Sequence, residues 1–193
     1  MFIITQKEFL AVGIVLCLYW KLDLLIYVAS GEKLLNKSKV RNEFIKLIFF
    51  MYIVGVISKV YFPLTVAWGE YINFKNPVIR LNPISSILII YNDGGMKSVI
   101  YNLGGNLLLL MPMGFFIGYY FRNIFNNMKR ILIAIFLVSL FIESTQVVLS
   151  LILPNVYRFF EINDLICNTV GGCLGYYLFK IRNRVEFFSD NFV

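Results

Sequence analysis

Residues 131–151 read ILIAIFLVSLFIESTQVVLSL, an apolar run in which Glu143 is the single charged residue. A helix needs about 20 mostly apolar residues to cross the hydrocarbon core of a bilayer, which is about 30 Å thick. The run meets that length. It therefore predicts a transmembrane helix that carries a carboxyl group close to its middle.

Four other apolar runs are long enough to span a bilayer, and they lie near residues 9–29, 47–67, 98–121 and 163–181. Apolar residues make up 59% of the chain, and its mean hydropathy is +0.75. Soluble domains typically contain about 45–50% apolar residues. The chain is therefore predicted to be an all-α integral membrane protein, a bundle of five transmembrane helices.

The first apolar run is interrupted by Lys21 and Asp23. A cleaved signal peptide is the alternative, since Val28-Ala29-Ser30 resembles a cleavage site of small residues. The segment opens with Lys7-Glu8, however, and lacks a positively charged n-region. We therefore favour an uncleaved helix.

Basic residues between the runs predict the orientation of the chain. Eleven fall on one side, namely Lys33, Lys37, Lys39, Arg41, Lys46, Arg122, Lys129, Arg130, Lys180, Arg182 and Arg184. The other side has five, namely Lys7, Lys75, Arg80, Lys97 and Arg158. Because cytoplasmic loops carry the excess of lysine and arginine, the N-terminus is predicted outside and the C-terminus inside.

The longest outside segment, residues 69–97, contains a short apolar run from Ile84 to Tyr91 followed by the turn signal Asn92-Asp93-Gly94-Gly95. Eight residues cannot span a bilayer as a helix. We expect this run to lie in the membrane interface or to dip partly into it. The predicted domains are a first helix with its basic loop (1–44), a transmembrane domain (45–181) and a cytoplasmic tail (182–193).

Charge and cysteine usage exclude several functional classes. The net charge of +7 is divided among short loops, which indicates topology rather than nucleic-acid binding. The chain has no histidine, and its three cysteines lie in apolar runs without a C-x-x-C pair. We therefore predict no disulfide framework and no thiolate metal site, and we expect no cofactor. An oxygen-rich polar cluster could hold Mg²⁺ or Ca²⁺, but amides replace several of the carboxylates that a firm site needs, so no metal is predicted.

Seven polar side chains are predicted between the bilayer midplane and roughly 12 Å outside it, at 1.5 Å per helical residue. They are Lys59, Asn102, Asn106, Glu143, Gln146, Asp164 and Asn168. On each of three helices, two of them are three or four residues apart and so share one helical face. Because burying a charge in a bilayer costs about 2.5–3.5 kcal/mol, such residues turn inward and find partners.

These faces predict one shared site near the outer surface. Its predicted ligand-binding residues are Asn102, Asn106, Gln146 and Asn168, with Arg80 and Arg158 leaning in from the outside loops, and its carboxyl groups are Glu143 and Asp164. The structural alternative is that Glu143 pairs with Lys59 while the amides only join helices, each bond contributing about 0.6 kcal/mol.

Small residues have a structural interpretation. Gly114-x-x-x-Gly118 and Gly171-x-x-x-Gly175 predict close helix contacts. Gly104-Gly105 and Pro112 are expected to loosen or kink their helix near Asn106.

Four motifs and a lone arginine follow one another along residues 45–181. They are Asn106-Leu-Leu-Leu-Leu-Met-Pro112-Met-Gly114, Glu143-Ser-Thr-Gln146, Arg158, Asp164-Leu-Ile-Cys-Asn168 and Gly172-x-x-Gly175. This ordered set resembles the VanZ-like family, which is named for an accessory protein of glycopeptide resistance associated with reduced susceptibility to teicoplanin. Family members commonly carry an N-L-I-P-F-like stretch in the long outside loop, where this chain has Arg80-Leu-Asn82-Pro83-Ile84.

The resemblance implies a multi-pass protein of the bacterial cytoplasmic membrane, surrounded by membrane lipids. The leading hypothesis is a site in the outer leaflet that binds or modifies an amphiphilic envelope molecule, either a lipid-linked cell-wall precursor or a lipoglycopeptide. A second is an intramembrane acid/base enzyme in which Glu143 and Asp164 are catalytic. A third is a structural membrane protein or a small transporter of envelope precursors. The oligomeric state is left open.

Overall fold

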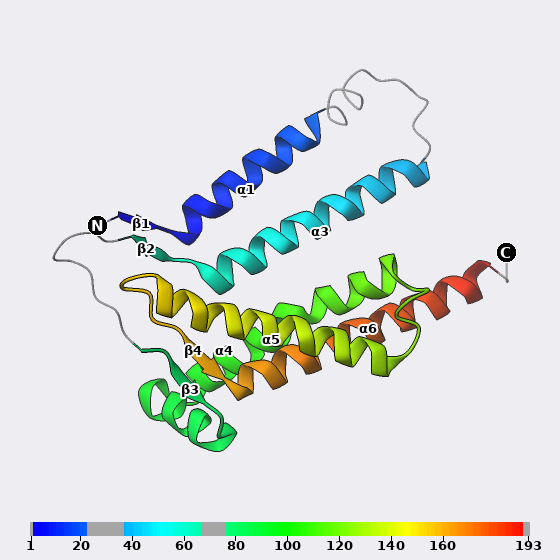
Figure 1. The fold of residues 1–193 in the computed structure, drawn as a ribbon. Coiled ribbons are helices and arrows are strands. Elements are labelled where there is room, and N and C mark those ends of the chain that lie inside the picture. Colours follow the sequence, from blue (N-terminus) through cyan, green and yellow to red (C-terminus); the bar gives the residue numbers. More distant parts are fainter. Residues whose placement is uncertain (1, 23–36, 67–75, 191–193) are drawn as a thin grey trace. The chain divides into compact units, whose positions relative to one another are not determined.

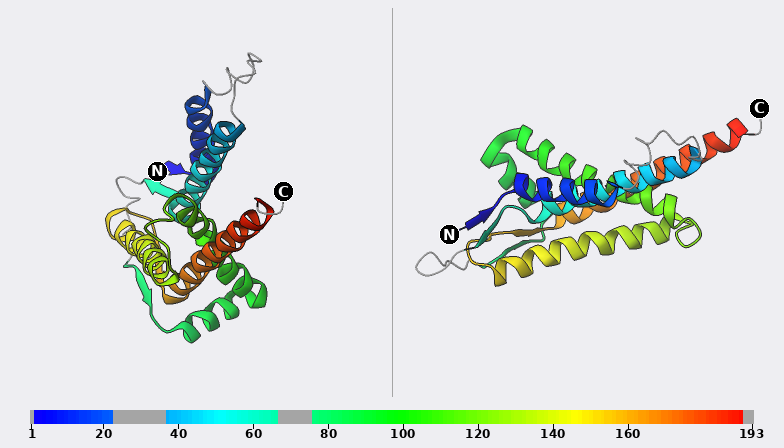
Figure 2. Two further views of the ribbon diagram at one scale, coloured as in Figure 1. Left: turned by 90° about the vertical axis from the view of Figure 1, so that its right-hand side faces the viewer. Right: turned by 90° about the horizontal axis from the view of Figure 1, so that it is seen from above.

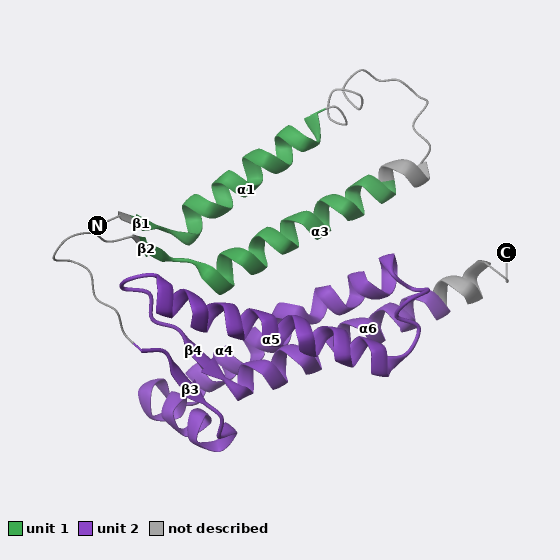
Figure 3. Cartoon of the chain, in the orientation of Figure 1, with its two compact units in different colours: residues 1–72 green, residues 73–193 purple. Residues whose placement is uncertain are grey.

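The computed structural model describes residues 2–22, 37–66 and 76–190. Three predicted stretches lie outside the described residues: the end of the first span, residues 30–36 of the basic loop, and residues 69–75 of the long loop segment. The rest of the basic loop, residues 37–46, is helical. The described chain forms five helices and four short strands (Figure 1). It divides into two compact units, residues 1–72 and 73–193 (Figure 3). The domain bounds predicted from the sequence stay a prediction.

Unit 1 contains α1 (Gln6–Trp20), α3 (Lys37–Tyr61) and an antiparallel pair of short strands, β1 (Phe2–Ile4) and β2 (Leu64–Val66). Thr5 and Glu8 form a capping box that starts α1. Gly13 of α1 lies against the side chain of Val54 in α3. The predicted span 47–67 therefore ends as a helix at Tyr61, and a strand follows.

The charge that interrupts the first apolar run is neutralised within unit 1. Lys21 caps the C-terminus of α1, is only 7% exposed, and forms an ion pair with Glu43 of α3. Glu43 also bonds Lys46 at 2.7 Å. The ion pair explains how a lysine is tolerated at the end of an apolar helix, since buried charges need partners.

Unit 2 contains three long helices and one pair of parallel strands. The helices are α4 (Pro83–Tyr120), α5 (Met128–Ile152) and α6 (Ile162–Asp190). The strands are β3 (Val78–Arg80), which leads into α4, and β4 (Phe159–Glu161), which leads into α6. Their pairing sets Arg80 opposite Glu161.

Helix α4 consists of two straight parts joined at Gly95, whose backbone has φ 69° and ψ −169° (Figure 2). Asn82 caps the first part, its Oδ1 accepting hydrogen bonds from the amides of Ile84 and Ser85 at 3.0 and 3.2 Å. The short apolar run therefore forms a helix of its own before the longer one. The break at Gly95 confirms the turn signal Asn92-Asp93-Gly94-Gly95, and only glycine adopts the conformation of residue 95 without strain. The expected break near Gly104-Gly105 and Pro112 is wrong, since the described backbone there keeps helical dihedral angles.

Glycines bring the backbones of α4 and α6 into direct contact. A Cβ atom added to Gly114 would overlap the carbonyl oxygen of Gly172, and one added to Gly171 would overlap that of Leu107. One added to Gly175 would overlap the carbonyl oxygen of Met111. From Leu107 to Met111 on α4 the contact moves from Gly171 to Gly175 on α6, so the two helices run parallel. The predicted packing role of these glycines is confirmed.

Three described helices are long and apolar enough to cross a membrane, within Arg41–Tyr61, Pro83–Tyr120 and Met128–Ile152. Helix α6 is less apolar, because its first half carries Asn163, Asp164 and Asn168. The described chain is thus helical, as predicted, with three helices long and apolar enough to cross a membrane, and the structure adds short strands. The bundle of five spans and the orientation stay predictions.

We predict that Gly175→Ala lowers the unfolding temperature of the purified protein in detergent. The added methyl group overlaps the backbone of α4, and such overpacking costs about 1–3 kcal/mol. Gly105→Ala is the matched control, since nothing lies within 4 Å of its added Cβ. It should be neutral or stabilising by about 0.5–1 kcal/mol, because alanine favours helix over glycine. Equal effects of the two substitutions would contradict the packing role.

Candidate functional site

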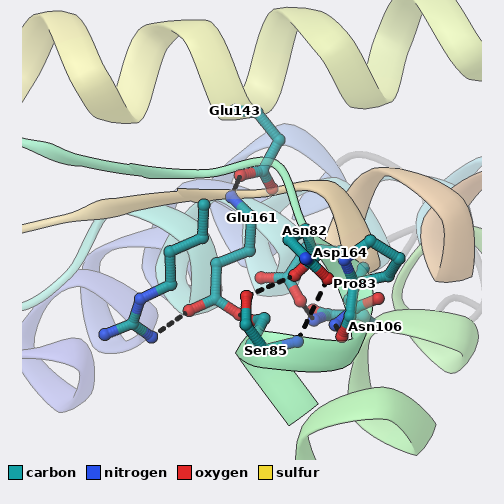
Figure 4. Close-up of polar contacts among 10 residues, drawn as sticks. Asn82, Pro83, Ser85, Asn106, Glu143, Glu161 and Asp164 are labelled. Atoms are coloured by element: carbon teal, nitrogen blue, oxygen red, sulfur yellow. Dashed lines mark hydrogen bonds and ion pairs between the residues drawn. The ribbon is translucent and has the colours of Figure 1, made fainter. Parts of the chain in front are cut away.

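Glu161, the last residue of β4, joins three segments of unit 2. Its Oε1 lies 2.6 Å from Nη1 of Arg80, and its Oε2 accepts a hydrogen bond from Oγ of Ser86 at 2.8 Å. Its backbone amide donates to Oε2 of Glu143 at 3.4 Å (Figure 4). Glu161 is 6% exposed and Ser86 is fully buried, so these contacts are shielded from solvent.

Local structure places the partners of Glu161. The parallel register of β3 and β4 puts Arg80 directly opposite Glu161, and the guanidinium carbon of Arg80 lies 4.4 Å from the ring centroid of Phe159. Ser86 lies in the first turn of α4, whose start is fixed by the Asn82 cap. A carboxylate that accepts from a guanidinium and a hydroxyl is held by charge-assisted hydrogen bonds.

Two further carboxyl groups lie beside Glu161. Glu143 projects from α5 and is 2% exposed. Asp164 lies in the first turn of α6, half-buried, and its Oδ1 accepts a hydrogen bond from Nδ2 of Asn106 in α4 (Figure 4). The hydrogen bond from the Glu161 amide to Glu143, and the three-residue separation of Glu161 from Asp164, bring these carboxyl groups to one end of unit 2. We refer to Glu143, Glu161 and Asp164 as the carboxyl cluster.

Asparagine side chains tie the beginnings of α4 and α6 together at the cluster. Nδ2 of Asn163 donates to the carbonyl oxygen of Pro83 at 2.9 Å, and Asn106 bonds Asp164 from the second part of α4. Both bonds join residues distant in sequence. The start of α4 at Pro83 and the start of α6 therefore both lie next to the carboxyl cluster.

The structure brings together four of the predicted site residues: Arg80, Asn106, Glu143 and Asp164. Asn102 lies one helical turn before Asn106, and Asn168 one turn after Asp164. Among the described residues, neither amide oxygen has a hydrogen-bond partner although both are buried.

The side-chain roles predicted for Gln146 and Arg158 stay predictions. The backbone carbonyl of Gln146 accepts from Oγ of Ser150 at 3.1 Å, and the same hydroxyl accepts from the amide of Arg158 at 2.8 Å. Burial lowers the pKa of the Arg158 guanidinium below its ordinary value. Lys59 belongs to unit 1, so its alternative pairing with Glu143 also stays a prediction.

Sequence reasoning missed Glu161, Ser86 and Asn163. In the predicted topology Glu161 falls in a short turn between two spans, where a charged residue costs little and needs no partner. Its position three residues before Asp164, in the stretch Glu161-Ile-Asn163-Asp164, was the available signal. Ser86 could not be found in this way, since its role depends on the strand pairing.

The carboxyl groups and amide oxygens of the site are hydrogen-bond acceptors. Carboxylates and amide oxygens accept hydrogen bonds and attract cations, and the three carboxyl groups have one bonded arginine among the described residues of unit 2. No three carboxylate, thiol or imidazole groups of the described residues are placed to hold a metal ion together. The arrangement is suited to a group that donates several hydrogen bonds or carries positive charge.

A model of the VanZ/LLP1 family matches residues 49–183. The matched stretch contains the whole carboxyl cluster, its bonded partners and the glycines that join α4 to α6. No curated protein and no solved structure is significantly similar to the chain.

We predict that Arg80 and Glu161 are energetically coupled. Arg80→Met leaves the Glu161 carboxylate buried and unpaired, which should lower the free energy of unfolding by about 3 kcal/mol. Glu161→Gln should cost less, because the arginine side chain is 22% exposed and can turn to solvent.

The double variant should recover at least about 1 kcal/mol relative to the sum of the two single changes. Unfolding of the purified variants in detergent measures this coupling. Lys97→Met, at an exposed position of α4, is the control and should change stability by less than about 0.5 kcal/mol. Strict additivity of the Arg80 and Glu161 substitutions would contradict the ion pair.

Proposed function

The chain belongs to the VanZ/LLP1 family, and on this premise we propose that its carboxyl cluster binds the headgroup of an amphiphilic cell-envelope molecule. The observation that carries the proposal is the excess of acceptors at one end of unit 2. Glu143, Asp164 and the amide oxygen of Asn102 supply acceptors. Arg80 already forms an ion pair with Glu161. A ligand with ammonium, amide or hydroxyl donors would satisfy them.

The surface around the cluster supports an amphiphilic ligand. Ile84, Leu88 and Tyr91 of the first part of α4 are 69%, 54% and 48% exposed, next to the buried Ser86 that bonds Glu161. A short helix with an exposed apolar face is suited to the interface between lipid tails and headgroups. A ligand could keep its tail in the lipid beside this helix while its headgroup meets Asp164 and Asn106, which are both half-buried.

The resemblance to VanZ-like proteins suggests the class of ligand. VanZ-like proteins are associated with reduced susceptibility to teicoplanin, a glycopeptide with a lipid tail. This points to a lipid-linked cell-wall precursor, or to the lipoglycopeptide itself, as a ligand bound in the outer leaflet of a bacterial cytoplasmic membrane. Arg158 would meet a carboxylate or phosphate of the ligand, and Gln146 would add a directional hydrogen bond. This assignment requires the carboxyl cluster to face outside, as the distribution of basic residues predicts.

Binding is favoured over acid/base catalysis by the way the carboxyl groups are held. Glu161 and Asp164 both accept hydrogen bonds from fixed side chains, as expected of groups that position a ligand. The catalytic alternative for Glu143 and Asp164 uses the same residues, and it requires a new product when the protein meets its substrate.

We predict that Asp164→Asn, Glu143→Gln and Arg158→Ala fail to restore teicoplanin susceptibility to its wild-type level in a deletion strain. Each removes a charge that the proposed ligand contacts. Vancomycin, which lacks the lipid tail, should show a smaller change. The measurement is the inhibitory concentration of both drugs at matched membrane levels of each variant.

Asp93→Asn is the matched control for this experiment. It makes the same carboxylate-to-amide change at an exposed position of α4 and should complement fully. Full complementation by all three site variants would contradict the proposal and would indicate that the cluster has only a structural role.

A further inference from the structure

The turn between α4 and α5, residues 121–127, lies beside the second half of α6, away from the carboxyl cluster at the start of that helix (Figure 1). It joins two helices that are long and apolar enough to cross a membrane. Because such helices end near the membrane surface, the turn belongs at the level of the lipid headgroups. Basic residues gather on it and on the neighbouring part of α6, namely Arg122, Lys129, Arg130, Lys180, Arg182 and Arg184.

Side-chain contacts hold the turn against α6. Oη of Tyr176 donates to the carbonyl oxygen of Phe125 at 3.0 Å, and Nζ of Lys180 lies 5.1 Å from the centroid of the Tyr176 ring. One turn further along α6, the amide oxygen of Asn183 accepts from Nη1 and Nη2 of Arg122 at 3.1 and 3.2 Å, with the amide oriented to suit these donors. Arg122 and Lys180 are thus both placed where the turn meets α6.

Arg130 is held on the same turn from the α5 side. Its Nη1 donates to the carbonyl oxygen of Ile124 at 2.8 Å, and its backbone amide donates to Oδ1 of Asn127 at 3.0 Å. Arg130 and its neighbour Lys129 are exposed. Carbonyl and amide oxygens carry no net charge, and a guanidinium has five N–H donors. The bonds of Arg122 and Arg130 therefore fix both groups without neutralising their charge.

The sequence around the turn is positive and holds no local carboxylate. Residues 112–142 and 165–185, which form this end of α4, α5 and α6, contain no aspartate or glutamate. The next carboxylates along α6 are Glu186 and Asp190, which are two against six basic residues. A surface with this excess of positive charge favours a partner with negative charge.

Exposed apolar side chains on the same turn indicate that this partner is a lipid. Phe121, Ile124 and Met128 are 52%, 59% and 39% exposed. At a membrane surface, apolar side chains of this kind lie among acyl chains while basic side chains reach the headgroups. A soluble phosphate or a nucleic acid would bind the basic residues but would leave the apolar surface uncovered.

We propose that this end of unit 2 binds the phosphate headgroup of an anionic phospholipid through Arg122, Lys129, Arg130 and Lys180. Guanidinium groups bind phosphate oxygens by charge-assisted hydrogen bonds, and lysines add positive charge. The acyl chains of the lipid cover the exposed apolar side chains of the turn. The site shares no residue with the carboxyl cluster, so it does not depend on the proposed function.

Native mass spectrometry of the full chain in detergent tests the site. The purified protein is mixed with equal amounts of anionic phosphatidylglycerol and zwitterionic phosphatidylcholine that carry the same acyl chains. Wild type should retain phosphatidylglycerol at least about twentyfold over phosphatidylcholine, because each basic residue near a headgroup adds about fivefold. Arg122→Gln combined with Arg130→Gln should lower this ratio at least about tenfold, and Lys129→Gln alone about threefold or more.

Lys97→Gln is the matched control, since it removes the same charge from an exposed position of α4 outside the turn and should keep the wild-type ratio. If the double variant does not fold, the exposed Lys129→Gln decides. The proposal is overturned if wild type shows no preference, as a carboxylate from elsewhere in the chain covering the turn would give. It is equally overturned if Lys97→Gln lowers the ratio as much as the turn variants, which would indicate an effect of net charge alone. Displacement of phosphatidylglycerol by inorganic phosphate or a short oligonucleotide at equal concentration would also overturn it.

Discussion

The ion pair between Arg80 and Glu161 is the interaction on which the arrangement of unit 2 depends. It fixes the register of β3 against β4, and through these strands it fixes where α4 and α6 begin. The same glutamate bonds Ser86 by its side chain and Glu143 by its backbone amide. One buried residue, Glu161, therefore joins β3, the short first part of α4, and α5.

Below this ion pair, direct backbone contact between α4 and α6 sets the depth of the polar side chains. Glycines at the contact leave no room for a side chain, so the two helices cannot slide without a clash. This packing places Asn106 beside Asp164 and leaves Ser139 and Asn168 enclosed one turn deeper. The closely packed apolar parts of α4 and α6 thus hold the carboxyl cluster in position, as a binding site built on packed helices requires.

Much of the site could be predicted because polar groups stand out in apolar sequence. Glu143, Asp164 and Asn106 were found in this way, and so was the packing role of the glycines. Glu161 was missed because its burial depends on pairing between segments far apart in the chain. The break at Gly95 could also be predicted, since Asn92-Asp93-Gly94-Gly95 is a turn signal; the glycine pair Gly104-Gly105 lacks the preceding Asn-Asp and stays helical.

The central claim is that the carboxyl cluster faces the outside of the membrane, and cysteine labelling in intact cells tests it most directly. Asn76→Cys, just before β3, and Asn126→Cys, in the turn between α4 and α5, are both exposed positions at opposite ends of unit 2. They would be made in a chain whose Cys17, Cys167 and Cys173 are replaced by alanine. A membrane-impermeant maleimide should label residue 76 in intact cells and residue 126 only after lysis. Labelling of residue 126 alone in intact cells would place the cluster at the cytoplasmic face and contradict the account.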